Sequence, residues 1–235
     1  MRVGPVGHVA DPAAPDLAGL HAEVGRYYAG KLKRFGPSPP GVDWSCQPTQ
    51  ELRFIQLLKL CAFDRPATLN DFGCGYGSLF GFLQRRFPHA DIDYLGIDLS
   101  PQMIRAARKG CHHPSAAFHT GTESPRTADY TVASGIFNVM LGHPVAIWEH
   151  FVATTLTHFS RTSRHGFAVN FVSRPGPGQD DAPGLYCTEP QRWVAFCKDQ
   201  LGHRANVVDR YGMSEFTLIA TRPEAASAPG RRRMS

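Results

Sequence analysis

The sequence predicts an α/β protein in which helices cover both faces of a doubly wound, mostly parallel sheet of seven strands. Between residues 65 and 222, short apolar stretches suited to buried strands alternate with amphipathic helical stretches, a pattern typical of βα units. The turn after the first of these strands is Gly73-Cys74-Gly75-Tyr76-Gly77, and the following strand ends in Asp98. Glycines at such a turn let the backbone approach a ligand, and an acid at the next strand end can bind two ribose hydroxyls. Together they predict a nucleoside-cofactor site.

Length and composition predict one α/β domain with an extension at each end. The chain has 235 residues, 42% of them hydrophobic, which suits one sizeable core and is short for two full domains. We expect a helical cap over residues 1–64, the α/β domain over residues 65–222 and a disordered basic tail over residues 223–235. The tail's three arginines and one glutamate contribute +3 − 1 = +2 of the net charge of +5. A basic tail can bind nucleic-acid phosphates, but the body has no interleaved aromatic and basic stripe, so we predict no nucleic-acid partner.

Two helices are predicted in the cap. Apolar residues recur at spacings of three and four from Leu17 to Leu32, with Asp16 as the N-cap, and the Pro/Gly stretch 36–41 ends that helix. A second amphipathic helix is predicted over residues 50–61, with Leu52, Ile55 and Leu58 facing inward and Leu57 as a further candidate.

The glycine turn lies within a βαβα unit. Residues 68–72 suit a buried strand and residues 78–87 a helix. Residues 92–97 form the next predicted strand, after which Ser100 is expected to cap a helix that begins at Pro101.

The motif Asp71-x-Gly73-x-Gly75-x-Gly77, followed by Asp98, resembles that of class I S-adenosylmethionine-dependent methyltransferases. In that family the first motif is acid-x-Gly-x-Gly-x-Gly and the second strand ends in an acid. The resemblance covers residues 65–222 and implies a Rossmann-like sheet whose last strand is antiparallel, with S-adenosylmethionine as cofactor. The glycine spacing is tighter than the dinucleotide form, which disfavours NAD. A Rossmann-like domain whose glycines only make a turn is the alternative.

The resemblance also implies roles for individual residues. The glycine loop would surround the amino-acid part of the cofactor, and Asp98 would bind the ribose. Leu99 and Met103 would lie near the adenine, where the segment Gly121-Thr122-Glu123 corresponds to the third motif. The implied cofactor-binding residues are Asp71, Gly73, Cys74, Gly75, Gly77, Asp98, Leu99, Met103, Glu123, Ser134 and Gly135.

The end of the fourth predicted strand should face the transferable group of the cofactor. Residues 116–119 can form the third strand, and the β-branched stretch 130–134 is a clear fourth strand that stops at Gly135. Asn138 follows closely, and its amide can donate to or accept from an acceptor molecule. A helix or turn cap is the alternative role for Asn138.

The second half of the domain continues the alternation. A helix over residues 145–159, a central strand over 166–172, a helix over 190–200 and a hairpin of strands 204–208 and 215–221 are predicted. The Pro/Gly-rich stretch 174–184 is expected to be an active-site lid. Tyr186 ends it and could present its ring to a sulfonium cation, with core packing as the alternative.

The cap is expected to line an acceptor pocket, as caps do in the resembling family. Tyr27, Lys31, Trp44 and Phe137 are the predicted substrate-pocket residues, and Tyr28 and Arg53 are further candidates. The alternative assigns the aromatic residues to the core and the charged ones to a solvated face.

Several classes are disfavoured. The six cysteines have no C-x-x-C spacing, which predicts reduced thiols and no metal site. No apolar run has the length of a membrane span, and the first residues have no apolar signal core, so a cytoplasmic protein without a membrane partner is predicted. The oligomeric state stays open.

The predicted activity is methyl transfer to a small molecule in specialised metabolism. The tetrapeptide Asn/Asp-Pro-Pro-aromatic, expected for amide-nitrogen or adenine-nitrogen acceptors, is missing. Asn138 and Tyr186 are the predicted catalytic residues. The same features would serve a cyclase that converts S-adenosylmethionine to azetidine-2-carboxylate and methylthioadenosine, and this alternative stays open. A non-catalytic cofactor-binding module is a third hypothesis.

Overall fold

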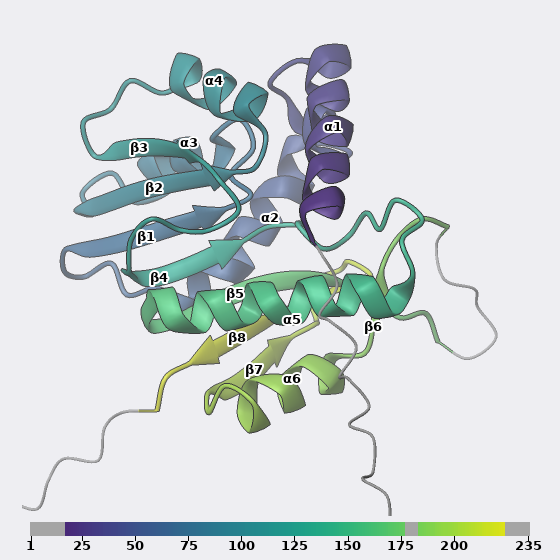
Figure 1. Cartoon of the computed structure of the whole chain (residues 1–235). Coiled ribbons are helices and arrows are strands. Elements are labelled where there is room, and N and C mark those ends of the chain that lie inside the picture. The colour runs from purple at the N-terminus through teal and green to yellow at the C-terminus, as the bar shows by residue number, and fades with distance from the viewer. Residues whose placement is uncertain (1–16, 177–182, 224–235) are drawn as a thin grey trace, which may run out of the picture.

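One twisted sheet runs through the molecule, and its strand order is β3-β2-β1-β4-β5-β8-β7 (Figure 1). A computed structural model describes residues 17–176 and 183–223. Strands β1 to β5 are parallel, whereas β8 is antiparallel to both of its neighbours. The strands are β1 (Ala67–Phe72), β2 (Ile92–Asp98), β3 (Ala116–Thr120), β4 (Ala128–Ala133), β5 (Ser163–Ser173), β7 (Arg204–Val208) and β8 (Glu215–Thr221). The predicted doubly wound fold with an antiparallel last strand is confirmed.

A short eighth strand, β6 (Cys187–Thr188), was not predicted from the sequence. It pairs with the end of β5 through Val172 and Ser173. A strand of two residues is too short to show hydrophobic periodicity, so only its pairing with β5 identifies β6.

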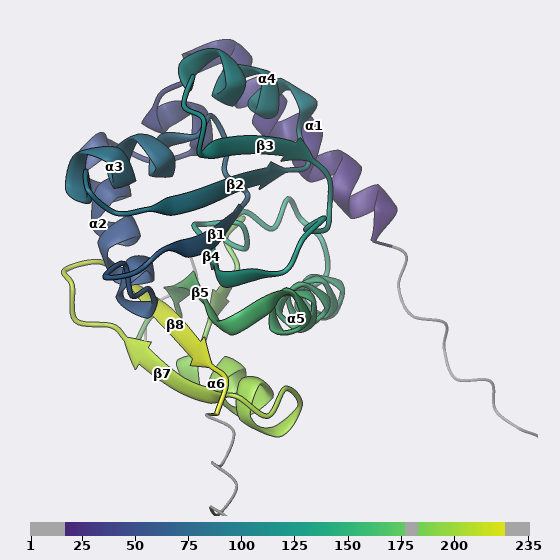
Figure 2. The ribbon, with the colours of Figure 1, turned by 90° about the vertical axis from the view of Figure 1, so that its left-hand side faces the viewer.

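Helices cover both faces of the sheet, because successive side chains of a strand point in opposite directions. In β5, Phe167, Val169 and Phe171 pack into one core cluster, and Ala168 packs into the other. Figure 2 shows α2 and α3 on one side of the sheet and α5 on the other. The helices are α1 (Ala18–Phe35), α2 (Gln47–Leu57), α3 (Ser78–Arg86), α4 (Pro101–Gly110), α5 (Val145–Thr162) and α6 (Pro190–Asp199), with 3-10 turns at Pro39–Val42 and Leu58–Leu60.

Local end signals agree with the structure in the βαβα unit. The Ser100 side chain accepts a hydrogen bond from the Met103 amide at 3.3 Å, and Pro101 is the first residue of α4. The predicted N-cap Asp16 lies outside the described residues, as do residues 177–182 of the predicted lid and residues 224–235 of the predicted tail.

The predicted inward face of the second cap helix is confirmed for Leu58 and Leu57, which are buried, and wrong for Ile55. Ile55 is 45% exposed, whereas Arg53 and Phe54 are buried. Apolar spacing alone did not identify the buried face, because α2 also buries Gln50, Arg53 and Gln56. Two of these side chains, Gln50 and Arg53, have polar partners there. No helix within residues 17–176 and 183–223 has the length and apolar character needed to cross a membrane.

Candidate functional site

A cavity of about 790 Å³ lies at the carboxyl ends of the parallel strands. Each of four strands contributes a lining residue there: Asp71 from β1, Asp98 from β2, and Val172 and Glu215 from β5 and β8. Glu215 reaches this edge because β8 is antiparallel and begins where the other strands end. Residues of α1 and of the segment from Val42 to Phe54 line the opposite wall.

The glycine loop after β1 approaches the cavity with its backbone. Gly73 has a φ of 75°, in the left-handed region, and an added Cβ there would lie 2.2 Å from Cγ2 of Ile136. The amides of Gly73 and Cys74 both donate to the Ile97 carbonyl, at 2.7 and 3.0 Å, which ties the loop to β2. Only glycine, which has no Cβ, can adopt this φ with its backbone so close to Ile136.

Asp98 is held by backbone amides on two sides. Its Oδ2 accepts from the Gly75 amide at 2.9 Å and its Oδ1 from the Ser100 amide at 2.8 Å. Burial raises the pKa of Asp98 to about 6, although these two hydrogen bonds act in the opposite direction. A carboxylate oxygen has more than one acceptor site, so Asp98 keeps capacity for ligand hydroxyls.

Asp71 is buried beside Asp98. The Tyr94 hydroxyl donates to Asp71 Oδ2 at 2.6 Å. Burial raises the pKa of Asp71 to about 7, the Tyr94 hydrogen bond lowers it, and the charge of Asp98 raises it further. Two neighbouring buried carboxyls therefore titrate near neutral pH.

Two buried polar atoms that follow β4 in the cavity wall have no hydrogen-bond partner among the described residues. They are Ser134 Oγ and Asn138 Oδ1. Leaving a buried polar atom unpaired costs roughly 1–3 kcal/mol. Their position after β4 points to a ligand that completes their hydrogen bonds.

A ring of five residues joins the cap to the sheet beside these atoms. The Gly135 amide donates to Asn170 Oδ1 at 2.8 Å, and Asn170 Nδ2 donates to Glu215 Oε2 at 3.0 Å. Glu215 forms a buried bidentate ion pair with Arg53, whose Nε–Oε2 distance is 2.8 Å. The Arg53 guanidinium stacks on Trp44 at 3.8 Å from the ring centroid. The indole in turn lies so close to Gly135 that an added Cβ would be 2.4 Å from it.

Most predicted site residues lie together in the cavity wall. The residues that line it are Tyr27, Trp44, Asp71, Gly73, Cys74, Gly75, Asp98, Leu99, Met103, Ser134, Gly135 and Asn138, together with the further candidates Tyr28 and Arg53.

Three predicted residues lie just behind or beside the wall. Gly77 precedes α3, where an added Cβ would lie 3.3 Å from the Phe118 ring, so it allows close packing of helix and strand. Lys31 forms an ion pair with Asp43, which itself lines the cavity. Glu123 is exposed, and its neighbours Gly121 and Thr122 line the cavity instead.

Tyr186 and Phe137 belong to the core and not to the cavity lining. Tyr186 is 3% exposed, and its hydroxyl donates to Glu149 Oε1 at 3.2 Å and lies 3.4 Å from Thr188 Oγ1. Burial raises the pKa of Tyr186 to about 12. Phe137 is fully buried and stacks on Phe171, because the turn after β4 directs its ring into the core. The alternative of core packing therefore describes Tyr186.

Glu215 and Asn170 were missed by sequence reasoning. Asn170 lies within the buried apolar stretch 166–171 of β5, and Glu215 begins the mostly buried strand β8. A charged or amide side chain in such a strand is the signal that could have found them, because buried polar groups require partners.

Among the described residues, no group of three or more His, Cys, Asp or Glu side chains is arranged to hold a metal ion. Residues 70–156 match a family described as "Methyltransferase domain". The chain is also 36% identical over 155 residues to "Putative methyltransferase Rv1506c" of Mycobacterium tuberculosis (strain ATCC 25618 / H37Rv), a match that spans 66% of this chain and 92% of that protein.

This chain belongs to the class I S-adenosylmethionine-dependent methyltransferase family.

Solved structures of methyltransferases share the fold. Magnesium protoporphyrin IX methyltransferase from Synechocystis PCC 6803, solved with bound SAM, superimposes with a TM-score of 0.58 at 15% identity, over 91% of this chain and 100% of that one. Human N-acetylserotonin methyltransferase in complex with SAM gives a TM-score of 0.60 at 14% identity, over 88% of this chain and 60% of that one. At these identities the likeness concerns the fold alone.

Proposed function

We propose that this methyltransferase transfers the methyl group of S-adenosylmethionine to a small molecule that carries a hydroxyl or amine. The supporting observation is a continuous cavity of about 790 Å³, whose lining runs from Asp98 and Leu99 to Ser134 and Asn138. Pockets of 300–1,000 Å³ are typical for small ligands. The cap of the same chain forms the opposite wall, which suits a low-molecular-weight acceptor, such as those of specialised metabolism, better than a macromolecule.

The residues of the cavity fit the cofactor. Asp98 would accept hydrogen bonds from the ribose hydroxyls, and Leu99, Met103 and Thr122 would surround the adenine. The backbone at Gly73 and Gly75 would lie against the amino-acid part, with Asp71 near its ammonium group. The left-handed φ of both glycines and the buried carboxyls are the observations that support this fit.

Methyl transfer requires the protein mainly to position the acceptor and to exclude water. Bound S-adenosylmethionine supplies a methyl carbon that is already activated by the adjacent sulfonium. Asn138 Oδ1, which has no partner among the described residues, would accept a hydrogen bond from the O–H or N–H of the acceptor and so orient its lone pair. Trp44, lying against Gly135, would exclude water from this end of the cavity.

Product analysis tests the reaction. Purified protein is incubated with S-adenosylmethionine alone, and then with a small-molecule extract of cells. Release of S-adenosylhomocysteine that depends on the extract supports methyl transfer. Methylthioadenosine and azetidine-2-carboxylate from S-adenosylmethionine alone would instead identify the cyclase, and tight binding without turnover in either case would identify the binding module.

Cofactor placement is tested separately with Asp98→Ala. Loss of hydrogen bonds to a charged group, about 1.5–3 kcal/mol, corresponds to an S-adenosylhomocysteine affinity roughly 10- to 100-fold weaker by calorimetry. Unchanged affinity would refute the placement of the ribose.

A further inference from the structure

The loop between β3 and β4 forms the side of the cavity where the adenosine is proposed to lie. Gly121 and Thr122 belong to this loop and line the cavity. The Gly121 amide donates to the Asp98 carbonyl at 3.0 Å, so the start of the loop is tied to the end of β2. The remainder of the loop, up to Arg126, is held by side chains.

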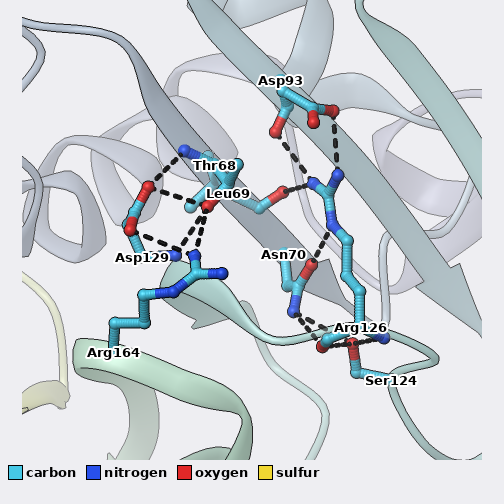
Figure 3. A network of polar contacts seen from close by, with 8 residues as sticks. All are labelled: Thr68, Leu69, Asn70, Asp93, Ser124, Arg126, Asp129 and Arg164. Carbon is cyan, nitrogen blue, oxygen red and sulfur yellow. Dashed lines mark hydrogen bonds and ion pairs between the residues drawn. The ribbon is translucent and has the colours of Figure 1, made fainter.

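Ser124 and Arg126 fasten the loop to the middle of β1 (Figure 3). Ser124 Oγ accepts from Asn70 Nδ2 at 2.9 Å and donates to the Arg126 carbonyl at 2.8 Å. Asn70 is fully buried, and its Oδ1 accepts from Arg126 Nε at 3.0 Å. A buried amide whose donor and acceptor both bind one loop gives that loop a single conformation.

Arg126 extends the fastening to β2. Its Nη1 donates to Asp93 Oδ1 at 2.8 Å, and its Nη2 donates to the Asp93 and Leu69 carbonyls at 2.8 and 3.2 Å. A separate group at the same end of the sheet, Asp129 with Thr68 and Arg164, joins β4 and β5 to β1 (Figure 3).

His158 of α5 supplies the last fastening. Its Nε2 accepts a hydrogen bond from the Ser124 amide at 2.8 Å. An imidazole nitrogen accepts only when it carries no proton, so this bond requires neutral His158 with its proton on Nδ1. The ring lies near Phe72 and Phe159, with centroids 6.0 and 6.4 Å away.

The surroundings of His158 favour this neutral form. Burial lowers its pKa, Arg161 on the same helix lowers it as well, and Glu123 in the loop raises it. Protonation converts Nε2 into a donor that faces the Ser124 N–H, so the bond is lost and two donors confront each other.

We propose that His158 is a positioning residue for the cofactor: through Ser124 it holds the loop that carries Gly121 and Thr122, and its protonation releases that loop and weakens adenosine binding. This inference rests on the proposed cofactor placement. It concerns a residue that lies outside the cavity lining.

Calorimetry with S-adenosylhomocysteine and with methylthioadenosine from pH 5 to 8 tests the proposal on three variants. His158→Gln keeps an acceptor at this position but does not titrate in this range. His158→Ala removes the acceptor. His150→Gln, on the same helix, is the matched control. Asp98 and Asp71 titrate in all of them, so the comparison between proteins isolates His158.

The wild type and His150→Gln should lose about fivefold more affinity than His158→Gln between pH 8 and pH 5, the equivalent of one hydrogen bond. His158→Ala should bind both ligands about fivefold more weakly at pH 8, and His158→Gln should restore most of this loss. Methylthioadenosine should respond as S-adenosylhomocysteine does, because the loop contacts the part that the two share.

Equal pH profiles for the wild type and His158→Gln would overturn the proposal, as would wild-type affinity in His158→Ala. Ring nitrogen NMR gives an independent readout: Nε2 should be unprotonated at pH 8, and a proton on it would overturn the proposal as well. A wild-type protein that does not bind either ligand would instead refute the proposed cofactor site, and this inference with it.

Discussion

Gly73 is the residue on which the shape of the glycine loop depends. In Gly73→Ala the new methyl group would lie 2.2 Å from Ile136, in addition to the cost of a left-handed φ, which is about 1–2 kcal/mol for other residues. We expect the affinity for S-adenosylhomocysteine to fall at least tenfold, because the loop must shift. Gly202→Ala is the control, since Gly202 has a φ of 67° and open space around it. Equal binding losses in the two variants would contradict the assignment.

Asp98 should also leave a pH signature on the free protein. Its pKa is about 6 in the folded chain and about 3.9 in an unfolded one. The folded state therefore binds the proton more tightly, and the contribution of Asp98 to stability falls as pH rises from about 4 to 6. The variant Asp98→Asn lacks this titrating carboxyl. The difference between its melting temperature and that of the wild type should therefore increase in favour of the variant as the pH rises from about 4.5 to 7. A constant difference between the two proteins over this range would show that Asp98 is not perturbed by burial.

At the scale of elements, a buried ion pair joins α2 to β8. Glu215→Gln leaves the Arg53 cation buried with its partner neutralised, and breaking a buried pair in this way costs roughly 3–5 kcal/mol. Urea unfolding should show a loss of this order. The control is Glu51→Gln, which breaks a pair with Arg85, a side chain that is 59% exposed; such surface pairs contribute about 0–1 kcal/mol. Similar losses in both variants would mean that the ion pair does not hold the cap.

The same element shows how far sequence reasoning reaches. The βα units were predictable because their signals are local: Ser100 and Pro101 mark the start of a helix, and the closely spaced glycines mark the turn after β1. The burial of Arg53 on α2 was not, because its guanidinium pairs with Glu215, 162 residues away. The predicted role of Tyr186 was wrong for a related reason: its hydroxyl donates to Glu149 on α5, and its ring lies in the core.

At the scale of the whole molecule, a cofactor that binds only the folded chain must stabilise it. At a ligand concentration 100 times Kd the gain is about 2.7 kcal/mol, which for a chain of this size raises the melting temperature by roughly 5–11 °C. S-adenosylhomocysteine should produce this shift in a thermal melt, and NAD at the same concentration should not. A shift with NAD alone would contradict the assignment of the cofactor.

The long separation between Arg53 and Glu215 also bears on how the protein is made. During translation the cap helices leave the ribosome well before the final hairpin exists, so the guanidinium of Arg53 stays without its counter-ion until residue 215 has been added to the nascent polypeptide. The ion pair between α2 and β8 can therefore form only late in biosynthesis. The polar link from Arg53 through Glu215 to Asn170 is complete only once that hairpin has been made, so a half-synthesised chain lacks this part of the cavity wall.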